Sequence, residues 1–199
     1  NLYHLADTFF VAKGVGTNAA GGLSVSFPLF LFLSAVTSML GGGGASVLSR
    51  ALGEKDEKKA NKVIANSFGI FFVTAAFITV SGLIFLEPLL YAVGVTKTLM
   101  PYAKAYTRII LSAAVVSTGF SSLIRAEGSS RYAMYIWTIP TSINLLLDPI
   151  LIIGFHMGIS GAAVGTAVSW CVSMAMSIWY FFLSGRRNVR IKIEDFRPD

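Results

Sequence analysis

Charged residues are scarce in this sequence. Only 13% of its 199 residues are Asp, Glu, Lys or Arg, whereas soluble globular domains carry about 25%. Hydrophobic residues make up 54% of the chain, and the mean hydropathy is +0.68. This composition excludes a soluble enzyme and indicates an integral membrane protein.

Cysteine is almost absent as well. The one cysteine, Cys171, lies inside an apolar run, which excludes a disulfide framework and a cysteine-based metal site. The glycine run at 41–44 is followed by Ala45 and Ser46, whereas a phosphate-binding loop requires Lys and then Ser or Thr. No zinc-ligand spacing, paired histidines or nucleophile motif is present. We therefore expect no enzymatic activity and no cofactor.

The basic residues are clustered rather than spread over a surface. Twelve of the sixteen Lys and Arg residues fall in three stretches, at 50–62, 125–131 and 186–197. Apolar segments separate these stretches, as expected for the cytoplasmic loops of a multi-pass membrane protein. We predict that all three are cytoplasmic, that the protein lies among the lipids of a prokaryotic plasma (inner) membrane, and that nucleic acid is not a partner.

Long apolar runs predict the transmembrane helices. Residues 1–13 are shorter than the roughly 20 apolar residues that span a bilayer, so we predict the second half of a first helix whose beginning is absent. A turn is expected at 14–22 and a connector at 87–101. Because the runs are continuous, helices are favoured over barrel strands, and we predict an all-α integral membrane bundle of six helices. The five remaining helices are expected at 23–49, 63–86, 102–124, 132–154 and 159–184.

One carboxylate lies inside the fifth predicted helix. Asp148 is surrounded by Leu, Ile and Pro, and an acid at a membrane helix centre costs roughly 2.5–3.5 kcal/mol and usually marks an ion or substrate path. Asn144 and Thr141 precede it at helical spacing and share its face. Pro149 lacks an N–H, which frees the carbonyl of Leu145. This set of hard oxygen ligands suits a proton or an alkali cation.

Two further positions extend this hypothesis. Asp7 is a second intramembrane acid, which is either a partner of Asp148 in one cavity or an interfacial residue at the end of a short helix. In the sixth predicted helix Thr166 begins a seam of hydroxyl side chains, and we favour Thr166 as a ligand. For the later seam residues Ser173 and Ser177 we favour helix–helix packing. Gly161, with the glycine four positions later, allows two helix backbones to approach closely.

Several long motifs resemble one transporter family. They are NLYHLADTFFVAKGVGTNAAGGLSVSFP, GGGGASVLSRALGEKDEKKAN, IRAEGSSRYAM and INLLLDPILIIGFHMGISGAAVGTAVS. They occur in order over almost the whole chain and are similar to the multidrug and toxic compound extrusion (MATE) family, in its DinF-like branch. The resemblance implies a transporter of twelve helices in two lobes. Residues 1–184 then correspond to the amino-terminal lobe and 185–199 to a cytoplasmic inter-lobe linker, with the carboxy-terminal lobe as the missing partner.

The resemblance also implies a function and a cation site. The function is multidrug efflux, in which a small-molecule drug or toxin, typically an amphipathic organic cation, is exported by alternating access in exchange for protons or sodium ions. The implied cation-coupling positions, which would also hold sodium, are Asp7, Asn144, Asp148 and Thr166. Thr141 and Ser121 are accessory candidates.

Two other functions remain open. A lipid-linked saccharide flippase of the same superfamily needs several basic residues in the membrane, where only Arg108 qualifies. A non-transporting membrane scaffold would not need two buried acids.

Overall fold

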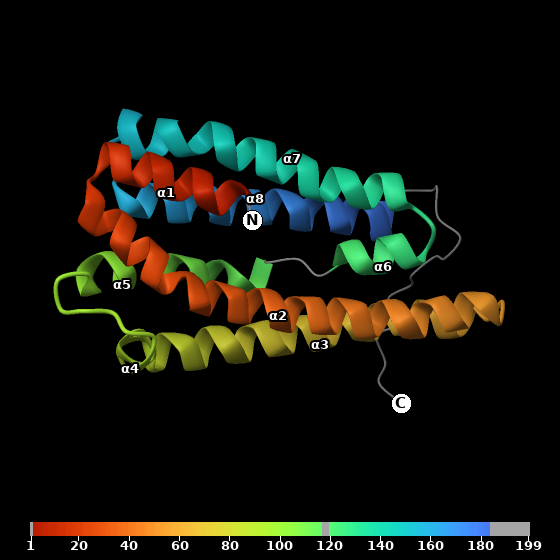
Figure 1. The fold of residues 1–199 in the computed structure, drawn as a ribbon. Helices are drawn as coiled ribbons and strands as arrows, with labels where there is room; N and C mark the ends of the chain where they lie inside the picture. The colour runs from red at the N-terminus through yellow and green to blue at the C-terminus, as the bar shows by residue number, and fades with distance from the viewer. Residues whose placement is uncertain (1, 117–119, 184–199) are drawn as a thin grey trace.

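The computed structural model describes residues 2–116 and 120–183, which form helices and turns with no strand in these ranges (Figure 1). The elements in chain order are α1 (Leu2–Gly14), α2 (Thr17–Gly53), α3 (Glu57–Ile84), α4 (Leu86–Ala92), α5 (Met100–Ala113), η1 (Ala114–Val116), α6 (Phe120–Ala126), α7 (Ser130–Pro149), η2 (Ile150–Gly154), α8 (Ile159–Ile178) and η3 (Trp179–Leu183). The predicted linker at 185–199 lies outside the described residues.

The described helices form a membrane-type bundle. Five segments are long and apolar enough to cross a membrane: Thr17–Gly53, Glu57–Ile84, Met100–Ala126, Ser130–Gly154 and Ile159–Phe182. The shorter α1 packs against α2 and α7. The α2–α3 and α6–α7 turns, which carry two of the basic stretches, lie at the same end of the bundle in Figure 1. The all-α, six-helix prediction is confirmed.

The α2–α3 hairpin is longer and more helical than the sequence suggested. α2 begins at Thr17, so the predicted turn at 14–22 is wrong; only a short turn at Gly16, with φ 118°, separates α1 from α2. The charged stretch 50–62 is mostly helical, because Asp56 caps α3 by accepting a hydrogen bond from the Lys59 N–H at 3.0 Å. Figure 1 shows this hairpin extending past the ends of α6 and α7.

The fourth predicted helix, at 102–124, changes from α-helical to 3-10 geometry after Ala113. α5 ends at Ala113, the 3-10 turn η1 follows, and α6 begins at Phe120. The Leu111 carbonyl accepts two hydrogen bonds here, one from the Ala114 N–H and one at 2.8 Å from the hydroxyl of Thr79 on α3. The predicted connector at 87–101 also contains a short helix, α4.

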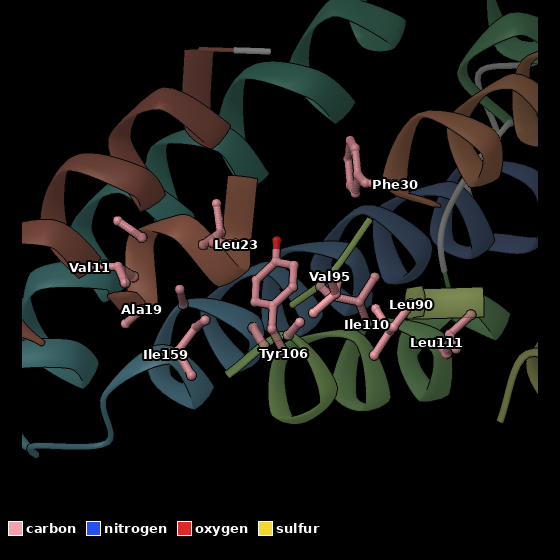
Figure 2. Packing of buried hydrophobic residues seen from close by; sticks show 14 of the residues in the cluster. Val11, Ala19, Leu23, Phe30, Leu90, Val95, Tyr106, Ile110, Leu111 and Ile159 are labelled. Atoms are coloured by element: carbon pink, nitrogen blue, oxygen red, sulfur yellow. The ribbon is translucent and has the colours of Figure 1, made fainter. Parts of the chain in front are cut away.

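Two apolar clusters hold the bundle together. The first joins α1, α2, α4, α5 and α8, and Figure 2 shows part of it around Leu23, Tyr106 and Ile159. The second lies nearer the basic turns, where the rings of Phe68 and Phe120 stack with centroids 4.0 Å apart. The polar site described below lies between these clusters.

Candidate functional site: a buried acid cluster beside a polar cavity

The carboxyl-terminal half of α7 carries the first two site residues. Asn144 and Asp148 lie one turn apart on the buried face of the helix, and the Asn144 Nδ2 donates to Asp148 Oδ1 at 3.2 Å. α7 ends at Pro149, after which the chain winds through the wider π-helical turn η2. Proline removes one backbone donor, and such turns are frequent at functional sites.

Two other helices complete the cluster. Asp7 comes from α1 and Thr166 from α8, and the Thr166 hydroxyl donates to Asp7 Oδ2 at 3.5 Å. Asn144 Nδ2 also lies 3.5 Å from the Thr166 oxygen, so Asn144 and Thr166 link Asp148 to Asp7. Both aspartates are fully buried. Four residues that the sequence analysis singled out therefore meet at one point between three helices.

Two glycines of α8 leave the space that lets α7 and α8 approach closely at this cluster. A Cβ at Gly165 would lie 2.8 Å from Asp148 Oδ1 and 3.4 Å from Asn144 Nδ2. A Cβ at Gly161 would lie 3.0 Å from the backbone carbonyl carbon of Leu151. The predicted close approach of helices at this glycine pair is confirmed, and its consequence is that Gly165 gives the Asp148 carboxylate its space.

The cluster leaves oxygen atoms without hydrogen-bond partners. These buried atoms are Asp7 Oδ1, Asn144 Oδ1 and Asp148 Oδ2. A buried acceptor left unpaired costs about 1–3 kcal/mol, so the arrangement is incomplete by itself. Carboxylate and amide oxygens together match a hard cation. Within the described residues no cluster of three or more His, Cys, Asp or Glu exists, which leaves no transition-metal site there.

A cavity of about 130 Å³ adjoins the cluster. Asn144 and Thr166 belong to both, because they line the cavity while contacting the aspartates. Phe30 from the first apolar cluster and Ile136 from the second also line it. Every other lining residue is apolar or carries a hydroxyl, namely Leu33, Ser34, Thr37, Ser38, Ser121, Ser122, Trp137, Pro140, Thr141, Ser169, Trp170 and Ser173.

Several cavity hydroxyls donate to backbone carbonyls, most of them in their own helix. Thr141 donates to the Trp137 carbonyl at 2.7 Å and Ser169 to the Gly165 carbonyl at 2.9 Å. Ser173 donates to the Ile136 carbonyl of α7 at 3.3 Å, which confirms the packing prediction for that residue. The structure places Thr141 on the cavity wall, one turn from the acid cluster.

Ser121 also lies on the cavity wall. Its oxygen accepts a hydrogen bond from Trp137 Nε1 at 3.0 Å, so Ser121 orients an indole ring. No hydrogen bond between Ser121 and either aspartate occurs in the described part of the chain.

Aromatic residues of the cavity were missed by the sequence analysis. Phe30 and Trp170 stack with ring centroids 6.1 Å apart, and Trp137 faces the same space. The sequence did contain a signal. Trp137 lies two helical turns before Asn144, and Trp170 lies one turn after Thr166, so each shares a helix face with a predicted site residue.

The fold and the site together define a multi-pass helical membrane protein with a sealed acid cluster at its centre. The MatE family model matches residues 1–150, and the chain belongs to this family, the multidrug and toxic compound extrusion transporters. It is accordingly a multi-pass protein of the plasma membrane.

Similar proteins cover the whole described bundle. An FAD transporter of Shewanella oneidensis is 31% identical over 192 residues, which are 92% of this chain and 42% of that protein. The multidrug export protein MepA of Staphylococcus aureus is 27% identical over 203 residues, covering 100% of this chain and 44% of MepA. The chain thus spans less than half the length of these curated relatives.

Solved structures agree with the fold. A crystal structure of MATE in the bent conformation superposes with a TM-score of 0.93 at 28% identity, covering 100% of this chain and 45% of that one. An inward-facing multidrug resistance MATE transporter gives the same TM-score and identity, with 46% of its chain covered.

Proposed function

We propose that this chain is the amino-terminal lobe of a cation-coupled efflux antiporter that exports amphipathic organic cations. The observation that carries the proposal is the shared wall between the acid cluster and the cavity. Asn144 and Thr166 touch the aspartates on one side and line the cavity on the other. An ion bound on one side therefore changes the polar groups offered to a substrate on the other.

The coupling ion is a proton or a sodium ion held at the acid cluster. Two carboxylates buried in one cluster repel each other strongly when both are charged, and a cation or a shared proton removes that repulsion. Asp7, Asp148 and Asn144 each offer one unpaired oxygen, and the Thr166 oxygen lies beside them. These four residues are the proposed ligands.

The substrate class follows from the cavity wall. Phe30, Trp137 and Trp170 offer aromatic faces, which attract organic cations by about 0.5–2 kcal/mol each. The hydroxyl groups supply weak polar contacts, and no Lys or Arg lines the cavity among the described residues. An uncharged, aromatic and partly polar wall suits an amphipathic cation with a planar ring system.

Two alternatives need basic groups that this cavity does not offer. FAD export, suggested by the Shewanella oneidensis relative, and flipping of a lipid-linked saccharide both require stabilisation of a pyrophosphate, for which arginine is the usual partner. The intramembrane Arg108 lies on α5 and is not among the cavity residues. Either alternative would place the phosphate contacts in a second lobe.

The proposed mechanism is alternating access between this lobe and a second one. Ion binding favours one conformation only to the extent that the ion binds that conformation more tightly. The acid cluster can bind the ion more tightly in the conformation that brings its three unpaired oxygens together. This conformation depends on helix packing, because α1, α7 and α8 all contribute residues to the cluster. Movement of these helices then alters the cavity wall and releases the substrate.

The test is transport by the full-length protein in liposomes. Proton and sodium gradients are imposed separately, and efflux of a fluorescent organic cation is followed beside that of FAD. We expect one gradient to drive the cation and neither to drive FAD. Transport of FAD alone, or cation efflux that ignores both gradients, would contradict the proposal.

A further inference from the structure

A second hollow lies at the end of the bundle opposite the basic turns. Its volume is about 360 Å³, and it is formed where α3 meets α4 and where α5 begins. It shares no lining residue with the cavity beside the acid cluster. The distribution of basic residues predicts that this end faces outward, so we call this feature the outer hollow.

The outer hollow carries more positive than negative charge. Lys104 donates a hydrogen bond to Glu87 and forms an ion pair with it. This contact lowers the pKa of Glu87. Arg108 follows Lys104 by one turn of α5, and its exposed guanidinium has no carboxylate partner within the described residues. Two cations and one anion leave a net charge of +1.

The remaining wall of the outer hollow is apolar. Leu83 and Ile84 form the last turn of α3, and Leu86 begins α4. Ile84, at the lipid-facing end of a membrane-spanning helix, is 69% exposed. The occupant must therefore cover apolar surface and neutralise a positive charge at the level where the membrane core ends.

We propose that the outer hollow binds one anionic phospholipid of the outer leaflet. Its phosphate lies between Arg108 and Lys104, and its acyl chain runs along Leu83 and Ile84. Arg and Lys near helix ends extend their charged groups to the interface, where phosphates lie, and Arg binds phosphate with paired hydrogen bonds. A free phosphate ion would match the charge but would leave the apolar wall uncovered, so the lipid is the occupant that satisfies both features.

The experiment is native mass spectrometry of the full-length protein released from nanodiscs. The nanodiscs contain phosphatidylcholine with a minor fraction of phosphatidylglycerol, and inorganic phosphate is titrated in a separate arm. We expect one retained phosphatidylglycerol on the unaltered protein. Arg108→Gln should lower its retention by at least about tenfold, the effect of losing one charge-assisted hydrogen bond. Arg108→Lys should retain the lipid more than Arg108→Gln does.

The matched control is Lys97→Gln. Lys97 is an exposed cation at the same end of the chain's bundle, between α4 and α5, and it does not line the outer hollow. This variant removes the same charge and should retain the lipid. Equal retention by Arg108→Gln and the unaltered protein would overturn the proposal. Equal loss in both variants would show attraction by surface charge alone and would also overturn it, as would displacement of the lipid by millimolar inorganic phosphate.

Discussion

The acid cluster and the adjoining cavity are both polar, yet they satisfy their polar groups in opposite ways. In the cavity, hydroxyls such as those of Thr141 and Ser169 donate to backbone carbonyls of their own helices. In the acid cluster, Asp7, Asn144 and Asp148 each keep one buried oxygen without a partner. The hydroxyls of Thr141 and Ser169 thus have partners within the protein, whereas the three cluster oxygens are left for an ion. Substitutions should therefore be tolerated in the first region and costly in the second.

The largest effect is expected for Asp148→Asn. Asn has the size of Asp and keeps one acceptor oxygen, but it cannot exchange a proton at neutral pH and brings no negative charge to a cation. Efflux driven by the effective gradient, measured in liposomes with the full-length protein, should fall to the level of empty liposomes. Insertion and detergent melting should stay near normal, because removing a buried charge eases membrane insertion. Asp7→Asn should act in the same direction.

Asp56→Asn is the matched control for these variants. Asp56 caps α3 outside the acid cluster, and Asn is as good a helix cap as Asp, so efflux should be unchanged. Near-normal pumping by Asp148→Asn would show that the carboxylate is only structural and would refute the proposed coupling site.

A smaller but still large effect is expected for Gly165→Ala. The added methyl group would lie 2.8 Å from Asp148 Oδ1, and overpacking of this kind costs about 1–3 kcal/mol. Gradient-driven efflux should fall by about tenfold, with a lowered melting temperature. Gly43→Ala is the control, because a Cβ at Gly43 meets no atom within 4 Å. If both variants behave alike, Gly165 does not position Asp148.

A moderate effect is expected for Thr166→Val. This change keeps the shape of the side chain and removes the hydroxyl that lies 3.5 Å from both Asp7 Oδ2 and Asn144 Nδ2. Losing one hydrogen-bonding group of about 1 kcal/mol corresponds to about a fivefold weaker apparent affinity for the coupling ion. The measurement is efflux rate against ion concentration. An unchanged concentration dependence would exclude Thr166 from the ion site.

The smallest effect is expected for Ser169→Ala, three residues later on the same helix. Ser169 lines the cavity, and its hydroxyl donates to the Gly165 carbonyl within α8. Removing it leaves no unpaired donor and exchanges serine for a better helix former. Efflux and its ion dependence should stay within about twofold of the unaltered protein, since this bond lies within α8 and touches neither aspartate. A loss as large as that of Thr166→Val would mean that the two regions do not differ.

The sequence predicts the helices and the cluster residues better than it predicts what surrounds them. Continuous apolar runs identify the spans, and the spacing of Asn144 and Asp148 on one helix follows from local periodicity. Asp7 and Thr166 were candidates from the residues alone, but contacts between distant helices have no local signal, so their meeting with that pair was implied only by the resemblance. The close approach of Gly165 to Asp148 also depends on how α7 and α8 pack, which the local sequence does not encode.

Helix boundaries were the least predictable part of the fold. The turn expected at 14–22 contains small residues, but tertiary packing keeps most of them helical: a Cβ at Gly22 would lie 2.8 Å from the Tyr102 Cβ of α5. The change to 3-10 geometry after Ala113 occurs without a proline nearby. The Thr79 hydroxyl of α3 donates to the Leu111 carbonyl at this point, a contact that the local sequence around 113 cannot reveal.

The long α2–α3 hairpin has a practical consequence for imaging. The 37 residues of α2 measure about 55 Å at 1.5 Å per residue, whereas the apolar core of a bilayer is about 30 Å thick. The two helices therefore continue past the lipid and end in a charged tip at 54–56. A rigid helical domain inserted there, or an antibody fragment raised against the tip, would be held in a fixed orientation. Such an addition would give a small membrane protein the asymmetric mass outside the detergent belt that particle alignment in electron cryo-microscopy requires.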